Sequence, residues 1–147
     1  MPSILIAFLN ADVIAAGISP FAPEEAAIAA GRIMHAEIDR RVRLRQSFAF
    51  ETTLSSRGFA RMIPEWRHVG YRVTLIFVRL NSVEMSILRV ADRVRPGGHS
   101  IPELVIRRRF PLGLWNFEHL YRDLLDDWLL YDNSGNAPVV VATGELS

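Results

Sequence analysis

The segment Tyr71–Leu80, with the sequence YRVTLIFVRL, constrains the fold of this chain more than any other. It is nearly continuously apolar over the length of one strand, a pattern typical of a parallel sheet that is covered on both faces. We therefore expect a strand that is buried on both faces. Parallel strands need crossover connections, usually helices, so this segment also predicts helices elsewhere in the chain.

Helix-like and strand-like segments alternate along the rest of the sequence. A first apolar run covers Ile4–Leu9, and Pro23 with the two acids after it favours a helix that extends to about Arg45. The further elements that we predict are a loop containing Gly17 and Pro20, a strand at Ser47–Leu54, a helix from Ser55 or Ser56 to about Val69 with a kink at Pro64, a helix from about Val83 to Val94, a loop at residues 95–102, a helix from Pro102 that Pro111 interrupts and whose second piece ends near Asp127, and strands at residues 128–133 and 138–142. This alternation predicts an α/β fold with a mostly parallel sheet flanked by helices, in a single domain over residues 1–147.

The composition argues against several classes of protein. The formal net charge is +1 and cysteine is absent, which argues against binding nucleic acid or an anionic membrane over the whole surface and excludes disulfides. No stretch has the roughly 18 consecutive apolar residues of a membrane span. The four histidines show no metal-ligand spacing. We expect a cytoplasmic protein without a protein-bound metal site.

All 17 basic residues are arginine, and lysine is absent. Biased codon usage in a GC-rich genome explains such a composition without any function. The chemical consequence is the same in either case. A phosphate-binding loop of the form GxxxxGK[ST] needs a lysine to reach the β- and γ-phosphates, and these 147 residues contain none.

Two carboxylates follow predicted strands at the edge where parallel sheets bind ligands, beyond the carboxyl ends of the strands. Asp12 follows the first apolar run and Glu51 follows the next strand, so the two could converge on one substrate, one as base and one as hydroxyl anchor. The alternative is structural: Asp12 caps the following turn and Glu51 pairs with an arginine. The same rule adds further residues to this candidate rim, namely Asn10, Thr52, Thr53, Asn81 and residues 132–134.

Six arginines surround the sequence PGGHSIP. They are Arg89, Arg93, Arg95, Arg107, Arg108 and Arg109. Guanidinium groups present a donor fork that suits phosphate, so a hinged lid carrying them could close over a triphosphate and stabilise developing charge. The alternative is a solvated helix face with Asp92 and Glu103 as partial counter-charges.

Five segments, in this order and at these spacings, resemble the zeta-toxin-like P-loop kinase family, in particular its uncharacterised bacterial members. They are FLNADVIAAGISPF, FAFETTLSSRGFARMI, GYRVTLIFVRL, RVADRVRPGGHSIPELVIRRRF and LYDNSG, and the similarity covers about Phe8–Gly144. The resemblance implies a P-loop-kinase-like sheet, ATP and Mg²⁺ as cofactors, and phosphoryl transfer to a hydroxyl of a small molecule. In the toxins of the family that molecule is UDP-N-acetylglucosamine.

The resemblance also implies roles for individual residues. Asp12 corresponds to the general base on the acceptor hydroxyl, and Asn10, Glu51, Thr52 and Thr53 are the implied acceptor-binding residues. The implied phosphate- or nucleotide-binding residues are Arg93, Arg95, Arg107, Arg108 and Asn133.

The chain departs from the family pattern at its N-terminus. Family members carry a strand, a Walker A loop such as GPNGAGKTT and its helix before the segment that matches FLNADVIAAGISPF. We therefore interpret the 147 residues as an N-terminally truncated kinase domain. By itself it should transfer no phosphate, because the missing groups supply most of the electrostatic stabilisation.

The alternative is a non-catalytic module that binds a nucleotide-sugar or a partner such as an antitoxin, or that self-associates. A nucleic-acid-binding domain that uses the arginine-rich helix is the least favoured interpretation. In the family the missing strand lies between the strand ending at Glu51 and Tyr71–Leu80. Those two strands must pair directly, accept residues 3–8 or another chain between them, or leave a ladder unpaired.

Overall fold

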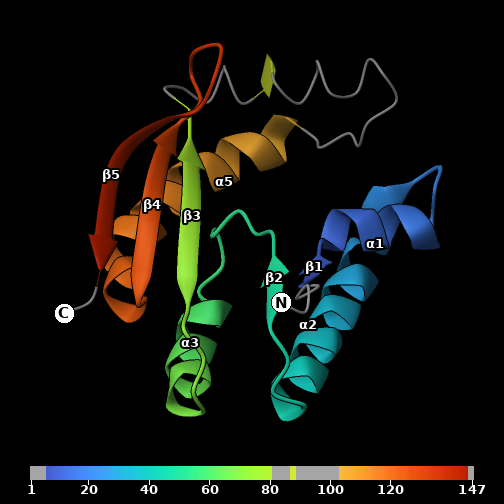
Figure 1. Cartoon of the computed structure of the whole chain (residues 1–147). Helices are drawn as coiled ribbons and strands as arrows, with labels where there is room; N and C mark the ends of the chain where they lie inside the picture. The colour runs from blue at the N-terminus through green and yellow to red at the C-terminus, as the bar shows by residue number, and fades with distance from the viewer. Residues whose placement is uncertain (1–5, 81–86, 89–102, 146–147) are drawn as a thin grey trace. The chain divides into compact units, whose positions relative to one another are not determined.

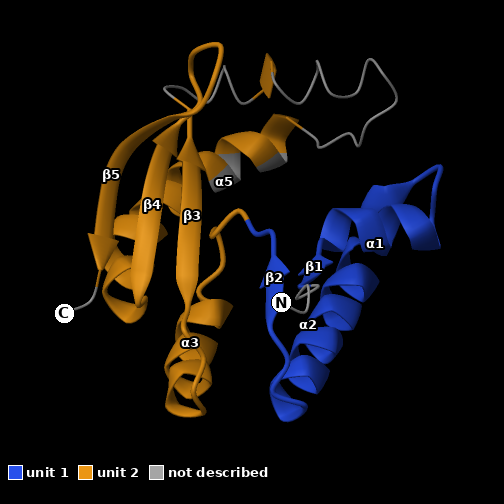
Figure 2. Cartoon of the chain, viewed as in Figure 1, with its two compact units in different colours: residues 1–52 blue, residues 53–147 orange. Residues whose placement is uncertain are grey.

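The computed structural model describes residues 6–80, 87–88 and 103–145 of the chain (Figure 1). The chain divides into two compact units, unit 1 with residues 1–52 and unit 2 with residues 53–147 (Figure 2). Each unit has its own sheet, with strand order β1-β2 in unit 1 and β3-β4-β5 in unit 2. The predicted α/β class, with parallel strand pairing and flanking helices, is confirmed.

Unit 1 is a parallel strand pair joined by helices. Strand β1 (Ala7–Leu9) pairs in parallel with β2 (Phe48–Phe50), and Leu9 lies opposite Phe50. The connection consists of α1 (Ala11–Ile18), the 3₁₀ turn η1 (Pro23–Ala26) and α2 (Ala27–Arg43). The helix start predicted at Pro23 is therefore a 3₁₀ turn that leads directly into α2.

Helix α1 corrects the prediction of a loop between the first strand and Pro23. Asn10 caps the helix: its side-chain Oδ1 accepts hydrogen bonds from the backbone N–H of Asp12 (2.8 Å) and of Val13 (3.3 Å). Such a cap satisfies backbone donors that the first helical turn leaves unpaired, and an acid in that turn complements the helix dipole. The cap and the alanine-rich sequence outweigh the single glycine, Gly17.

Small side chains hold the helices of unit 1 together. Ala15 of α1 is buried in a cluster with Ala26 and Ala30, and Met34 and Ile38 extend the same stripe of α2 at intervals of one helical turn. Alanines at the contact let two helix backbones approach closely. This packing fixes the start of α1, and with it the residues that follow β1.

Unit 2 contains a three-stranded mixed sheet. Strand β3 (Thr74–Arg79) pairs in parallel with β4 (Asp127–Asp132), and β4 pairs antiparallel with β5 (Val139–Glu145), with an irregularity between Leu130 and Tyr131. Its helices are α3 (Gly58–His68), α5 (Glu103–Asn116), the π-helical turn η2 (Phe117–Tyr121) and the 3₁₀ turn η3 (Arg122–Leu124).

Aromatic side chains join η2 to one face of this sheet. The ring of Phe117 stacks on Phe77 of β3 at a centroid distance of 5.1 Å and meets Trp128 of β4 edge-on at 5.3 Å. Both Phe117 and Trp128 are buried. These contacts supply the main apolar burial of the sheet in unit 2.

The prediction that Tyr71–Leu80 is buried on both faces is wrong. Residues of β3 alternate between exposed and half-buried, and Ile76 and Val78 are 60% and 51% exposed. The reason is that described residues of α5 and η2 cover one face of β3, whereas its other face, which carries Ile76 and Val78, stays open to solvent.

Two further helix predictions need correction. Pro111 lies inside α5 and does not interrupt it; its exposed position lets water bind the carbonyl that a proline leaves without a partner. The last helical segment ends at Leu124, and Asp127 already belongs to β4. The helix predicted at Val83–Val94 and the loop at residues 95–102 lie outside the described residues, except for the helical residues 87–88.

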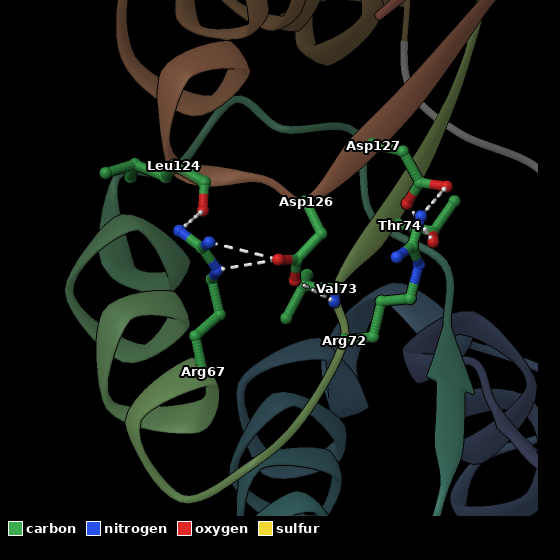
Figure 3. A network of polar contacts seen from close by, with 7 residues as sticks. All are labelled: Arg67, Arg72, Val73, Thr74, Leu124, Asp126 and Asp127. Carbon is green, nitrogen blue, oxygen red and sulfur yellow. Dashed lines mark hydrogen bonds and ion pairs between the residues drawn. The ribbon is translucent and has the colours of Figure 1, made fainter. Parts of the chain in front are cut away.

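Polar contacts fix the amino ends of β3 and β4 (Figure 3). Asp126 Oδ1 accepts hydrogen bonds from Arg67 Nε (3.1 Å) and pairs with Arg67 Nη2 (3.0 Å), while Asp126 Oδ2 accepts from the Val73 N–H (2.7 Å). Arg67 Nη1 also donates to the Leu124 carbonyl at 3.2 Å. Three segments of unit 2 are thus tied together by one carboxylate and one guanidinium.

In unit 1, β1 pairs with β2, which places Ala7 and Phe8 of the predicted SILIAF segment beside that strand. In unit 2, the described partner of β3 is β4. No single helix of the described residues is long and apolar enough to cross a membrane, although the bent pair Ala11–Ile18 and Pro23–Arg43 passes the same test of length and composition.

Candidate functional site

The carboxyl ends of β1 and β2 bring together two predicted site residues in unit 1. Asn10 follows β1 and Glu51 follows β2, and Asn10 Nδ2 donates a hydrogen bond to Glu51 Oε2 at 2.7 Å. The Glu51 N–H donates to the Leu9 carbonyl at 3.1 Å, which extends the parallel pairing by one residue. The backbone hydrogen bond therefore fixes the position of the Glu51 main chain, and the side chain of Asn10 fixes the orientation of its carboxylate.

Asn10 links this carboxylate to the start of α1. Its Oδ1 caps the helix through the N–H groups of Asp12 and Val13, while its Nδ2 binds Glu51. Asp12 then lies in the first helical turn, with an exposed side chain. The structural alternative, in which Asp12 itself caps the turn, is wrong because Asn10 makes the cap. Among the described residues, the hydrogen bond to the Glu51 carboxylate comes from Asn10.

This arrangement exposes two carboxylates near the start of α1 and the end of β2. Both Asp12 and Glu51 are exposed, so a ligand can reach both carboxylates from solvent. Glu51 Oε2 is held by Asn10, and a carboxylate has lone pairs on its second oxygen that can accept a hydroxyl group. Asp12, two residues after Asn10, adds a second exposed carboxylate, the kind of group that serves as a general base when it lies within hydrogen-bond reach of the proton it takes.

Thr52 and Thr53 follow Glu51 directly and are exposed. In unit 2, Thr53 Oγ1 and Ser55 Oγ lie 2.8 Å apart and share a hydrogen bond. Ser55 was not among the residues predicted from the sequence. Its signal was its spacing of two from Thr53 in the loop after a strand.

A second rim lies in unit 2, at the carboxyl ends of β3 and β4. The Asn133 N–H donates to the Arg79 carbonyl at 3.0 Å, and Arg79 Nε lies 3.6 Å from Asp132 Oδ2. The side-chain and backbone donors of Ser134, followed by Arg79, hold the pKa of Asp132 below its usual range. Arg79 was missed by sequence reasoning, which grouped only the arginines near PGGHSIP; its signal was its place as the last charged residue of the strand.

The predicted phosphate-binding arginines are described only in part. Arg93 and Arg95 lie outside the described residues, and Arg108 belongs to α5 but its side chain is not described. Arg107 Nε and Nη2 both donate to Glu103 Oε1, at 3.0 and 2.9 Å. This exposed i,i+4 pair is the contact expected of a solvated helix face, with Glu103 as counter-charge.

The comparisons with known proteins cover most of these segments, although the family-model match begins after Asn10 and Asp12 in the chain. The family model described as zeta toxin matches residues 17–137, which is more than half of the chain. An "Uncharacterized protein" of Haemophilus influenzae is 31% identical over 106 residues, covering 69% of this chain and 73% of the relative. No solved structure matches the chain. The resemblance found in the sequence is confirmed, and the chain belongs to the zeta toxin family.

Proposed function

We propose that this chain carries the acceptor-binding side of a small-molecule kinase and binds a nucleotide-sugar of the UDP-N-acetylglucosamine class. Membership of the zeta toxin family supports a P-loop-kinase-like function in general terms. The observation that carries the proposal is the 2.7 Å hydrogen bond between Asn10 and Glu51 at the carboxyl ends of two parallel strands, with Asp12 in the helical turn that Asn10 caps.

In this proposal the two carboxylates have different tasks. Glu51, oriented by Asn10, accepts a hydrogen bond from an acceptor hydroxyl and holds the sugar. Asp12 takes the proton of the hydroxyl that attacks the phosphoryl group. A group that only holds the acceptor contributes to binding, whereas a base contributes mainly in the transition state.

The family suggests the use of ATP and Mg²⁺. The residues that the structure describes contain no group of three or more His, Cys, Asp or Glu that could hold a metal ion without phosphates. A P-loop reaches the β- and γ-phosphates through a lysine, and because the 147 residues include none they do not supply that contact to a triphosphate. The proposal is therefore confined to the acceptor: the 147 residues bind it and transfer no phosphate by themselves.

The test is calorimetric titration of the chain with UDP-N-acetylglucosamine. We expect saturable binding that Glu51→Gln weakens about tenfold or more, equivalent to about 1.4 kcal/mol. Asp12→Asn should change the affinity little, because its role belongs to the transition state. Glu65→Gln is the matched control, since Glu65 is an exposed glutamate of α3.

Two results would contradict the proposal. One is the absence of binding heat from protein that circular dichroism shows to be folded. The other is a loss of affinity in Glu65→Gln equal to that in Glu51→Gln. Steady hydrolysis of ATP by the 147-residue chain would contradict the statement that it transfers no phosphate. The proposal also implies a cytoplasmic protein, because nucleotide-sugars and ATP are cytoplasmic metabolites; an antitoxin that covers this site would compete with the sugar in the same titration.

A further inference from the structure

We infer that Asn116 and Tyr121 are positioning residues that hold the loop Thr53–Ser56 with its hydroxyl groups outward, where Thr53 and Ser55 bind the acceptor. This inference rests on the proposed function. All contacts that carry it lie inside unit 2. They join the loop to the end of α5 and to the π-helical turn η2.

Three carbonyl groups of the loop face this helical segment. Asn116 Nδ2 donates to the Leu54 carbonyl at 2.6 Å, and the Tyr121 hydroxyl donates to the Ser56 carbonyl at 2.6 Å. The Thr53 carbonyl lies against Gly113, where an added Cβ would be only 2.6 Å from its oxygen. The helix thus needs a glycine at 113 and donors at 116 and 121 to accommodate this one loop.

The π-helical turn explains why these positions work together. In a regular α-helix, residues five apart point about 140° away from each other. The i→i+5 turn at Phe117–Tyr121 is wider, so that residues five apart come to the same side. Asn116 and Tyr121 can therefore both reach the loop, and π-turns of this kind are frequent at functional sites.

Both donors are buried. Asn116 is 2% exposed and Tyr121 is 1% exposed. Burial raises the pKa of the Tyr121 hydroxyl, against backbone hydrogen bonds from Ala60 and Phe59 that lower it, so the phenol keeps the proton that it donates. Where a buried side chain serves only packing, an apolar residue does the same without needing a hydrogen-bond partner. Two buried donors that both bind carbonyls of one loop therefore indicate that they hold the loop in place.

The loop itself is held in an unusual backbone conformation. Leu54 has a φ of 56°, in the left-handed region that non-glycine residues seldom adopt, and its side chain is 3% exposed. Strain of this kind persists where the surroundings enforce it, and it concentrates at ligand-binding sites. With the Leu54 side chain and three carbonyls turned inward, the exposed Thr53 and half-buried Ser55 present hydroxyls 2.8 Å apart.

A pair of hydroxyls in a fixed loop suits a ligand rich in hydroxyl and phosphate oxygens. Each hydroxyl can both donate and accept. Because the loop is already ordered, a ligand that binds it does not have to order it first. If the hydrogen bonds from Asn116 and Tyr121 were lost, the hydroxyls of Thr53 and Ser55 would remain, but their positions would no longer be fixed.

The experiment compares Tyr121→Phe with Tyr131→Phe, which removes a hydroxyl from β4 and serves as the matched control. Affinity for UDP-N-acetylglucosamine is measured by calorimetry, and melting temperature is measured alongside. We expect Tyr121→Phe to weaken binding at least fivefold and Tyr131→Phe to leave it unchanged. In a double-mutant cycle with the combined variant Thr53→Val, Ser55→Ala, the loss from Tyr121→Phe should shrink to less than twofold, because Tyr121 acts through these two hydroxyls. A full fivefold loss on top of the combined variant would overturn the inference.

Hydrogen exchange of the ligand-free protein provides a readout that needs no acceptor. Tyr121→Phe, and Asn116→Ala as a second variant, should speed exchange of the backbone amides at residues 53–57 at least tenfold and leave those of β4 unchanged. Unchanged exchange in the loop would refute the positioning role, whatever the titrations give. If the wild-type chain binds no nucleotide-sugar but the loop exchange responds as expected, the proposed acceptor is wrong and the anchoring of the loop by Asn116 and Tyr121 stands.

Discussion

The two neighbouring aspartates at the start of β4 should contribute very differently to stability. Asp126 accepts hydrogen bonds from Arg67 and from the Val73 N–H, and Asp127 pairs with Arg72 (Figure 3). Arg67 and Asp126 are 32% and 23% exposed, whereas Arg72 is 68% exposed. The first pair joins three segments and is partly buried on both sides. The second pair involves an arginine side chain that is mostly exposed to solvent.

The magnitude for Asp126→Ala follows from the contacts that it removes. A hydrogen bond to a charged group contributes about 1.5–3 kcal/mol, and a partly exposed ion pair adds about 0.5–1 kcal/mol. Water can replace part of both at a site that is about a quarter exposed, so we expect a loss of about 2.5 kcal/mol. With a urea m-value of about 2.5 kcal/mol/M, that loss lowers the unfolding midpoint by about 1 M.

The assay is urea unfolding followed by tryptophan fluorescence, with Arg67→Ala and Arg72→Ala as a matched pair of arginine truncations. Arg67→Ala should lower the midpoint nearly as much as Asp126→Ala, because it also loses the bond to the Leu124 carbonyl. Arg72→Ala should leave the midpoint within experimental error. Equal shifts of the urea midpoint in Arg67→Ala and Arg72→Ala, with an unchanged m-value, would refute the reasoning. In that case burial and the number of connected segments would not determine how much these ion pairs contribute to stability.

Two further predictions concern pH and glycine. The Val73 N–H, followed by Arg67, holds the pKa of Asp126 below its ordinary value of 3.8. The ionised Asp126 carboxylate therefore stabilises the fold above pH 3.8, and this contribution is lost as the pH falls through the lower folded-state pKa. In urea titrations, the difference in unfolding free energy between wild type and Asp126→Asn should decrease as the pH falls below 3.8. Gly31→Ala in α2, where an added Cβ meets nothing within 4 Å, should raise stability by about 0.5–1 kcal/mol. Gly144→Ala, where the Cβ would overlap the indole ring of Trp128, should lower stability by about 1–3 kcal/mol and shift the indole emission. In thermal melts, a lower melting temperature for Gly31→Ala would contradict the first prediction, and a higher one for Gly144→Ala would contradict the second.

The part of the candidate site that depends on strand ends could be predicted from the sequence. Asn10 and Glu51 come after apolar runs of recognisable strand character, and the rule for parallel sheets places the residues after such runs on one edge. The hydrogen bond between them agrees with that placement. The prediction worked because it needed only the period of the strands and their direction.

The two residues that hold the loop Thr53–Ser56, Asn116 and Tyr121, could not be predicted in the same way. Asn116 and Tyr121 lie more than 60 positions from the carbonyls that they bind, and their residue types alone indicate only a polar position on a helix. The π-turn that brings them to one side and the left-handed Leu54 depend on tertiary packing. Local propensity does not contain this information. The same limit explains Pro111, whose helix continues because residues beyond it are held by the loop and the sheet.

The contacts of Asn10 explain why this position needs an asparagine, whereas the sequence predicted only that Asn10 lies at the edge of the sheet. Its amide oxygen accepts from two N–H groups at the start of α1, and its amide nitrogen donates to Glu51. Aspartate would cap the helix as well, but it would set a second carboxylate 2.7 Å from Glu51, where neither could donate. Serine would cap the helix but, being shorter, would not span the gap to Glu51. Only an amide satisfies both neighbours with one orientation, so the cap that starts α1 and the contact that orients the Glu51 carboxylate are one structural feature.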